Sequence, residues 1–404
     1  MSANLDNIRN DIDKLAEFNA TPANGLTRFS YTDEHQKVKE YISQEMKKAG
    51  LEIYEDAVGN LFGQRSGLDN SLPVVMVGSH FDSVKNGGIF DGTAGVVAGL
   101  EIARILHSKN IKTKYPIFIA ALVEEEGGRF GSGLFGSRAM IGKVAQDDLS
   151  RYKDENGVSI AEAMQKFGLK PENLEKANNW KDKIKSFIEL HIEQGPILEN
   201  EKKDIGIVET IVGIAAYEVE ITGRPDHAGT TPIDMRANAL LLASAIVQYV
   251  DKLAIEAGEG TVATVGKLEV FPGAVNIVPG KVYFTFETRS RNEHKVEHIV
   301  NSVEGFLKEK CKNGLTYNIK KILLKKPTPL SPKIISTMEE NAKRLNLNYK
   351  NMISGAGHDA MFIREIADTG MVFVPSKNGR SHCPEEWTDY EKIKIGTDLI
   401  YQTV

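Results

Sequence analysis

Four apolar segments, separated by stretches long enough for helices, constrain the fold of this chain more than any other feature. They are PVVMVGSH (73–80), PIFIAALVEEE (116–126), SFIELHIEQG (186–195) and TGMVFVPS (369–376). Strands with continuous apolar runs are typical of parallel sheets, which are buried on both faces. Between the first two segments, GTAGVVAGLEIARILHS predicts a helix with one apolar face, formed by Val96, Leu100, Ala103 and Leu106. The pattern predicts an α/β fold with a mostly parallel sheet covered by helices on both faces.

The pattern changes after about residue 206, where apolar and polar residues begin to alternate with a period of two. Such alternation predicts half-buried antiparallel strands, which we expect to be of the edge type. Further strands and two amphipathic helices follow, over 237–254, 261–290 and 293–311. We therefore expect an inserted α+β domain with a four-stranded antiparallel sheet and two helices on one face. The expected domains are 1–210 with 328–404 for the main domain, and 211–327 for the insert.

Composition excludes several classes of protein. The net charge is −5 over 404 residues, and no clustered basic face indicates a nucleic-acid binder. The two cysteines, Cys311 and Cys383, cannot form a disulfide framework or a cysteine zinc cluster, and they suit a reducing compartment. The first residues lack the pattern of a signal peptide, and no stretch approaches the roughly 18 apolar residues of a membrane span. These features predict a cytoplasmic protein without a membrane or nucleic-acid partner.

Histidines and carboxylates gather where the apolar strands end. His80, His191 and His382 lie at or just beyond predicted strands, and ligand sites in open parallel sheets lie at the carboxyl ends of strands. The carboxylates at the same edge are Asp82, Asp91, Glu124, Glu125, Glu126 and Glu193. Histidine with carboxylate, and without thiolate, suits divalent zinc, manganese or cobalt. Glycines near Asp91 allow a tight turn that returns this carboxylate to the strand end.

Each of these residues also has an ordinary structural explanation. A single strand-end histidine such as His80 is more often a hydrogen-bonded residue than a metal ligand. Asp91 also suits a helix N-cap, and a run of glutamates alone suits a solvated turn. However, three consecutive carboxylates after an apolar parallel strand place like charges at a half-buried edge, and a bound cation compensates for them. We interpret His107, His294 and His298, on predicted helices, as surface residues.

Seven motifs follow one another along the chain: GSHFDSV…GGIFDGTAGV, EEEGGRFGSGLFGSRAM, LHIEQGPILE, GRPDHAGTTPIDMRANAL, GAVNIVPG, SGAGHDAMF and NGRSHCPEEW. They resemble the amidase, hydantoinase/carbamoylase family, which belongs to the dimetal aminoacylases and carboxypeptidases. The resemblance extends from GLTRFSYTDEH almost to the end of the chain, and EEEGGRF, HIEQGP and SGAGHDA separate this family from its peptidase relatives. It implies a dimetal exopeptidase-like catalytic domain and a homodimer formed through the insert, which would also act as a lid.

The resemblance implies a centre of two divalent metal ions, zinc, manganese or cobalt, bridged by Asp91. His80 and His191 would complete one site, and Glu126 and His382 would complete the other.

Two further carboxylates have roles in the family pattern. Asp82 corresponds to the carboxylate that orients His80 by accepting its other ring N–H. Glu125 corresponds to the general base. The pattern places base and ligand directly before the glycine, which selects Glu125 and Glu126 over Glu124.

The implied chemistry is hydrolysis of an amide-type C–N bond. Two neighbouring cations can hold a bridging water and lower its pKa, and Glu125 would take the proton as the bridging hydroxide attacks a carbonyl carbon. His227 corresponds to the histidine that stabilises the oxyanion. The remaining positions that match substrate-contacting residues are Gln194, Asn276, Arg289, Gly357 and His358. Arg289 suits a substrate carboxylate, because guanidinium binds carboxylate as a bidentate fork.

Two positions depart from the family pattern. Cys383 follows His382 where asparagine is more usual, and we expect it not to be a ligand although it could make the site sensitive to oxidation. Glu287 stands where an aspartate is usual, two residues before Arg289.

The substrate expected from the resemblance is a small ureido compound that carries a carboxylate. N-carbamoyl-L-amino acid hydrolase is the first expectation, with allantoate amidohydrolase and β-ureidopropionase as alternatives that share the same residues. A hydrolase of N-acyl amino acids or peptides is a further alternative. A non-catalytic binding protein with this fold would have lost its acid–base residue, whereas every such position is filled here.

Overall fold

The computed structural model describes residues 2–404 and divides the chain into two compact units. The first unit comprises the chain up to Glu209 together with Leu330–Val404, and the second is Thr210–Pro329. The second unit therefore interrupts the first in sequence. Within residues 2–404, no helix is both long enough and apolar enough to cross a membrane.

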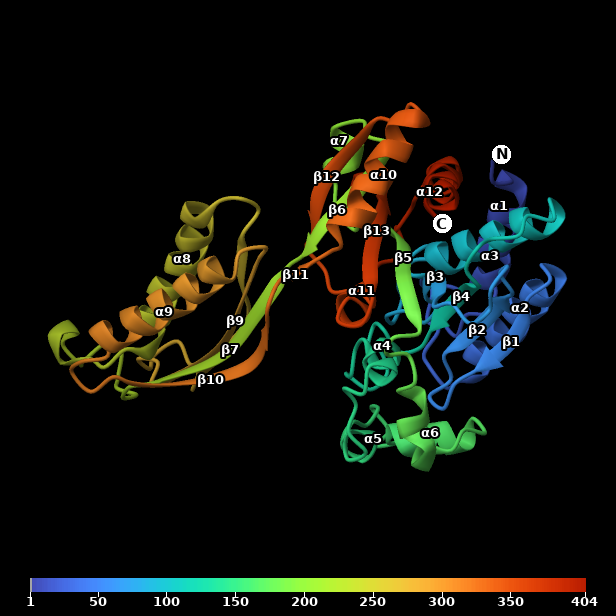
Figure 1. The fold of residues 1–404 in the computed structure, drawn as a ribbon. Coiled ribbons are helices and arrows are strands. Elements are labelled where there is room, and N and C mark those ends of the chain that lie inside the picture. The colour runs from blue at the N-terminus through green and yellow to red at the C-terminus, as the bar shows by residue number, and fades with distance from the viewer. Residues whose placement is uncertain (1) are drawn as a thin grey trace. The chain divides into compact units, whose positions relative to one another are not determined.

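A nine-stranded sheet has the order β1-β2-β4-β3-β5-β13-β6-β11, with β12 paired to β6 (Figure 1), and all of its strands except β11 lie wholly or mainly in the first unit. Its strands are β1 (Glu52–Glu55), β2 (Leu61–Arg65), β3 (Val74–His80), β4 (Ile117–Leu122), β5 (Ile184–Ile192), β6 (Ile205–Ile211), β11 (Thr328–Pro329), β12 (Tyr349–Ser354) and β13 (Asp368–Val374). The four apolar segments of the sequence form β4, β3, β5 and β13, which are adjacent and parallel. Antiparallel strands β2 and β6 extend this parallel centre on its two sides. The predicted sheet is confirmed.

Helices cover both faces of this sheet. Leu190 of β5 points to one face, where its side chain lies against Gly396 of α12 (Tyr390–Thr403). The preceding Glu189 accepts a hydrogen bond from the N–H of Ala360, the first residue of α11 (Ala360–Ile363). Because successive side chains of a strand point to opposite faces, α12 and α11 lie on opposite sides of the sheet.

The helices of the first unit are α1 (Leu5–Ala16), α2 (Asp33–Lys48), α3 (Thr93–Ser108), α4 (Phe135–Met140), α5 (Asp148–Arg151), α6 (Ile160–Lys166), η1 (Pro171–Ala177), α7 (Ile197–Asn200), α10 (Pro332–Arg344), α11 (Ala360–Ile363), η3 (Lys377–Gly379) and α12 (Tyr390–Thr403). The helix α3 differs from its prediction, because it is buried on nearly every side and not only on one face. It packs on β3, β4 and β5, while α1 and α12 cover its other side. Its small residues allow this close packing.

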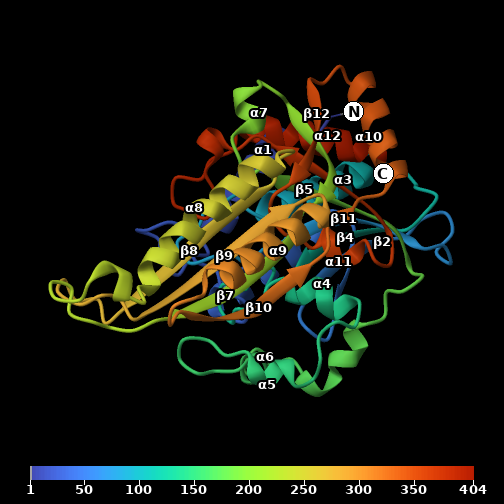
Figure 2. The ribbon, with the colours of Figure 1, turned by 90° about the vertical axis from the view of Figure 1, so that its left-hand side faces the viewer.

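The second unit is an α+β fold of its own, with the antiparallel strand order β10-β7-β9-β8 (Figure 2). Its elements are β7 (Gly213–Thr222), η2 (Ile233–Met235), α8 (Ala239–Ala257), β8 (Val262–Phe271), β9 (Lys281–Ser290), α9 (Glu293–Lys310) and β10 (Thr316–Lys325). Both α8 and α9 pack on one face of the sheet and on each other. The predicted architecture, a four-stranded antiparallel sheet with two helices on one face, is confirmed, although one of its strands is not among those predicted from the sequence.

The edge-type prediction for the strands after residue 206 is wrong. β6 lies inside the large sheet, and β7 lies between β10 and β9. Alternation in β7 arises because one face meets the helices and the other does not, and this pattern does not distinguish a central strand from an edge strand. The fourth strand of the small sheet is β10, which sequence analysis did not identify.

Candidate metal centre

Adjacent parallel strands and one glycine turn bring the predicted ligands to one edge of the large sheet. His80 is the last residue of β3 and lies opposite Leu122, the last residue of β4, while His191 lies near the end of β5. Asp91 returns over this edge because Gly92 has φ 62°. A Cβ at Gly92 would lie 2.3 Å from Cε1 of His80, so only glycine allows this close approach.

Two histidines face one oxygen of Asp91. The distances from Oδ1 of Asp91 are 3.4 Å to Nε2 of His80 and 3.1 Å to Nε2 of His191. On the far side of each ring, Nδ1 lies near a main-chain carbonyl, that of Asp82 (3.1 Å) for His80 and that of Ile192 (3.0 Å) for His191. Since a carbonyl can only accept, each Nδ1 carries the proton. When Nε2 is deprotonated, as it is in a metal ligand, rings held in this way direct their Nε2 lone pairs toward Asp91.

A second group forms around the other oxygen of Asp91. Nε2 of His382 lies 3.4 Å from Oδ2 of Asp91 and 3.3 Å from Oε2 of Glu126. The buried Oε1 of Glu126 has no hydrogen-bond partner among the described residues. The two groups, His80–Asp91–His191 and Asp91–Glu126–His382, therefore share Asp91, and Cys383 belongs to neither.

The charges of these side chains depend on one another. Burial alone would lower the pKa of His80, but carboxylates at Glu125, Asp82 and Asp91 raise it well above its usual value. Burial and the nearby Asp91 raise the pKa of Glu126 to about 8. Lone pairs and carboxylates that converge in a buried site require protons or a cation between them. These residues, and the unpartnered oxygen of Glu126, fit a divalent metal ion.

The three consecutive glutamates point to different places. Glu124 turns away from the metal groups and accepts the N–H of Phe130 (3.1 Å). Oε2 of Glu125 lies 3.6 Å from Nε2 of His80, and burial raises the pKa of Glu125 well above its usual value. Glu125 is thus beside the metal groups without belonging to either one.

Asp82 fixes the turn that carries these glutamates. Its carboxylate accepts the main-chain N–H groups of Glu125 (3.1 Å) and Glu126 (3.2 Å). The same carboxylate lies 3.6 Å from Nδ1 of His80, farther away than the main-chain oxygen of Asp82. Asp82 therefore links the end of β3 to the turn after β4.

Three residues at this site have backbone conformations that non-glycine residues rarely adopt. Glu124, Gln194 and His382 have φ values of 52°, 58° and 56°. Gln194 donates from Nε2 to Oδ2 of Asp91 at 2.7 Å, so its side chain lies beside the metal groups. Such backbone strain is typical of sites whose surroundings fix a functional geometry.

His358 and Gly357 precede α11 in the same unit. The ring of His358 is buried, bonds through Nε2 to Oγ of Ser354 (2.9 Å), and lies 4.5 Å from the ring of His191. Glu189 and these two histidines form a third group of side chains that could hold a metal ion. Glu189 also accepts a hydrogen bond from the hydroxyl of Ser79 (2.7 Å). Sequence analysis missed Glu189, although a carboxylate inside the apolar segment SFIELHI was a signal for it.

The other predicted residues lie in the second unit. His227 is exposed and forms a β-bridge with Ile277, and the N–H of Ala228 donates to the carbonyl of Asn276 (2.9 Å). His227 and Asn276 therefore belong to two loops that are held together. Nε of Arg289, in β9, donates to Glu287 at 2.6 Å, so the residue that departs from the family pattern orients this guanidinium.

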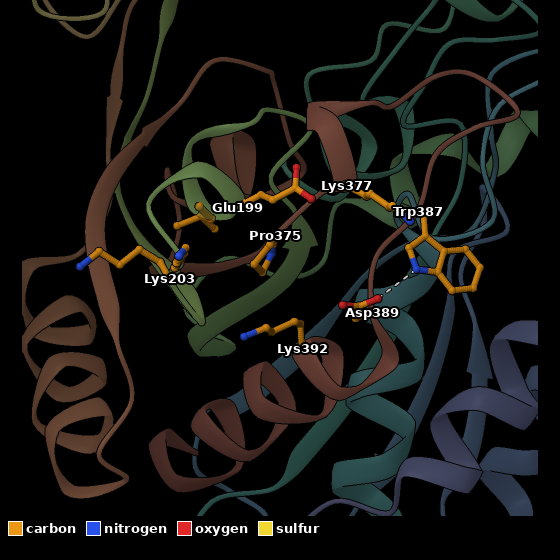
Figure 3. A pocket seen from close by; sticks show the side chains of 9 residues that line it. Glu199, Lys203, Pro375, Lys377, Trp387, Asp389 and Lys392 are labelled. Carbon is orange, nitrogen blue, oxygen red and sulfur yellow. Dashed lines mark hydrogen bonds between the residues drawn. The ribbon is translucent and has the colours of Figure 1, made fainter.

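A cavity of about 280 Å³ in the first unit lies beside the segment that carries His382 (Figure 3). It is lined by Leu198, Glu199, Lys202, Lys203, Pro375, Lys377, Trp387, Asp389 and Lys392. None of these is a predicted ligand, so this cavity is separate from the metal groups.

Comparison with known proteins agrees with this geometry. Residues 74–404 match the family described as peptidase family M20/M25/M40. The chain is 44% identical over 403 residues to an N-carbamoyl-L-amino-acid amidohydrolase of Paenarthrobacter aurescens, covering all of this chain and 98% of that protein. It is 35% identical over 398 residues to an allantoate amidohydrolase of Escherichia coli, covering 96% and 95% of the two chains.

A solved structure has the same fold. It is an amidase of the hydantoinase/carbamoylase family from Burkholderia multivorans, with a TM-score of 0.92 and 33% identity, and the match covers 100% of this chain and 97% of that one.

Proposed function

The chain belongs to peptidase family M20/M25/M40 and, within it, to the hydantoinase/carbamoylase amidases, and from this premise we propose that it is an N-carbamoyl-L-amino acid hydrolase. It is a hydrolase of carbon–nitrogen bonds other than peptide bonds. The observation that supports the proposal most is the convergence of two ligand groups on Asp91 with Glu125 beside them. The products would be the amino acid, carbon dioxide and ammonia.

We propose two divalent ions per chain, zinc, manganese or cobalt. His80 and His191 would hold one, Glu126 and His382 the other, and Asp91 would bridge them. When bound, such ions activate water and polarise the carbonyl group that is attacked.

Glu125 would be the general base, with proton transfer at its carboxylate. Burial raises its pKa, which keeps the carboxyl basic enough to accept a proton from water. The same carboxyl would then deliver the proton to the leaving nitrogen. Asp82 would hold Glu125 in place through its main-chain N–H.

Substrate recognition is proposed for both units. Gln194, Gly357 and His358 would contribute from the first unit. His227 would stabilise the oxyanion, and Asn276 and Arg289 would bind the substrate, with Arg289 on its carboxylate. We further propose a homodimer formed through the second unit, in which His227 serves the partner's metal centre.

The substrate is tested by ammonia release from a panel of N-carbamoyl-L-amino acids, allantoate and β-ureidopropionate, with N-acetyl amino acids assayed for amino-acid release. We expect the highest kcat/KM for an N-carbamoyl-L-amino acid. The second candidate is allantoate hydrolysis, which the similarity to the Escherichia coli enzyme favours, and higher kcat/KM for allantoate would select it. A folded chain that binds metal but turns over no member of the panel would refute both.

A further inference from the structure

A buried carboxylate joins the two segments that carry Asp91 and His382. Oε1 of Glu386 accepts hydrogen bonds from the main-chain N–H groups of Phe90 (3.0 Å) and Asp91 (3.1 Å). Oε2 accepts the hydroxyl of Ser381 at 2.8 Å, and this hydroxyl also lies 2.9 Å from Oδ2 of Asp91. The residue is only 4% exposed, although 296 positions separate it from Phe90.

Gly88, in the segment before α3, leaves space for the carboxylate of Glu386. A Cβ at Gly88 would lie 2.1 Å from both Cδ and Oε1 of Glu386. The backbone of Gly88 is not left-handed, so the requirement for glycine here comes from the space that Glu386 occupies.

The rest of the segment that carries His382 is less firmly packed. The side chain of His382 is 48% exposed, and its φ is 56°. Lys377, Trp387 and Asp389 of the same stretch line the cavity in Figure 3, so part of its surface faces open space. The ring of Trp387 packs edge-on against the ring of Phe90, with 5.2 Å between the ring centroids. The two segments therefore also contact each other at the residue that follows Glu386.

We propose that Glu386 is a positioning residue that docks the segment 381–386 onto residues 90–91 and thereby sets the metal affinity of the Asp91–Glu126–His382 group. Glu386 belongs to none of the ligand groups, so it acts through the placement of His382 relative to Asp91. This inference rests on the proposed two-ion centre.

The test is metal binding by variants, measured by equilibrium dialysis with elemental analysis for Mn²⁺ and Zn²⁺. Glu386→Ala leaves the N–H groups of Phe90 and Asp91 unpaired, and we expect one ion to bind about 10- to 100-fold more weakly while the other keeps its affinity. His382→Ala should show the same selective loss. Glu386→Gln retains Oε1 as an acceptor and can donate to Ser381, so it should bind both ions nearly as the wild type does.

Glu385→Ala is the matched control, because Glu385 is an exposed neighbour that pairs with Arg380 at 2.9 Å. It should leave both affinities unchanged. Gly88→Ala displaces the Glu386 carboxylate from the other side and should reproduce the selective loss. If circular dichroism shows that Glu386→Ala does not fold, Gly88→Ala is used in its place to test the proposal.

The outcomes separate two failures. A wild-type chain that binds fewer than two ions refutes the two-ion centre and the role of Glu386 with it. Two ions in the wild type, bound equally tightly by folded Glu386→Ala or Gly88→Ala, refute only the role of Glu386.

Discussion

Nε2 of His80 and Nε2 of His191 lie 3.4 Å apart, although 111 positions separate the two residues. They come from neighbouring parallel strands, β3 and β5, and each donates its Nδ1–H to a main-chain carbonyl. Two acceptor nitrogens at this distance repel each other unless a positive charge lies between them and Asp91. Together with Asp91, this pair would hold one of the two proposed ions.

Glu125→Gln should lower kcat by about 10²- to 10⁴-fold while leaving metal content unchanged, because the amide keeps the shape but cannot accept a proton. Glu126→Gln should instead weaken the binding of one ion, since an amide oxygen is a poorer ligand than a carboxylate. Steady-state kinetics together with elemental analysis check both variants. Equal metal loss in the two would show that the assignment of base and ligand is wrong.

Metal affinity should rise with pH. Contact with Asp91 raises the pKa of His382 to about 9, and burial raises that of Glu126 to about 8, so in the metal-free chain both hold protons at neutral pH. An ion must displace these protons, and this cost disappears as pH rises through the pKa values. The apparent Kd at pH 8 should therefore be at least about tenfold lower than at pH 6.5. Calorimetry in two buffers should detect proton release, and a pH-independent Kd would contradict the assignment.

Arg289→Lys should raise KM about tenfold for substrates with a carboxylate, because a point charge replaces a planar fork. A substrate analogue with a neutral amide in place of the carboxylate should lose little more through the substitution. Kinetics with both substrates check this. Equal losses would make Arg289 a structural partner of Glu287 and not the carboxylate anchor.

The proposed role of His227 in the partner's site is tested with a double variant. His227→Ala and Glu125→Gln on one chain, mixed with wild type, leave neither site of the heterodimer complete if His227 acts in the partner. Such heterodimers, isolated through two affinity tags, should be nearly inactive. If His227 serves its own chain, the wild-type subunit stays competent, and about half of the wild-type activity per dimer overturns the proposal.

Local patterns predicted the parts of the fold that depend on burial. The four apolar segments became four adjacent parallel strands, and the ends of two of them carry His80 and His191. The strand β10 was not predicted from the sequence. It has no fully buried residue, and its lysine-rich sequence therefore lacks a strong apolar alternation. The sequence also did not predict that α3 is buried on nearly every side. Helical periodicity identifies the most apolar face of a helix but does not show which elements cover its other faces.

The contacts that hold the site together could not be predicted in this way. Glu386 meets Phe90 across 296 positions, and Glu189 meets Ala360 across 171. Such pairs depend on how the chain returns to the sheet edge, which no local pattern records. The motif NGRSHCPEEW contains Glu386 but gives no reason to select it, whereas Glu189 had one signal, its place as a carboxylate inside an apolar segment.

The most direct test of the central claim is metal content measured together with ammonia release from N-carbamoyl-L-amino acids. We predict two divalent ions per chain, loss of activity when a chelator removes them, and recovery to different degrees with manganese, cobalt or zinc. Removal should also lower the free energy of unfolding, since ions that bind the folded state stabilise it. Full activity in a chain shown by elemental analysis to contain no metal would contradict the account.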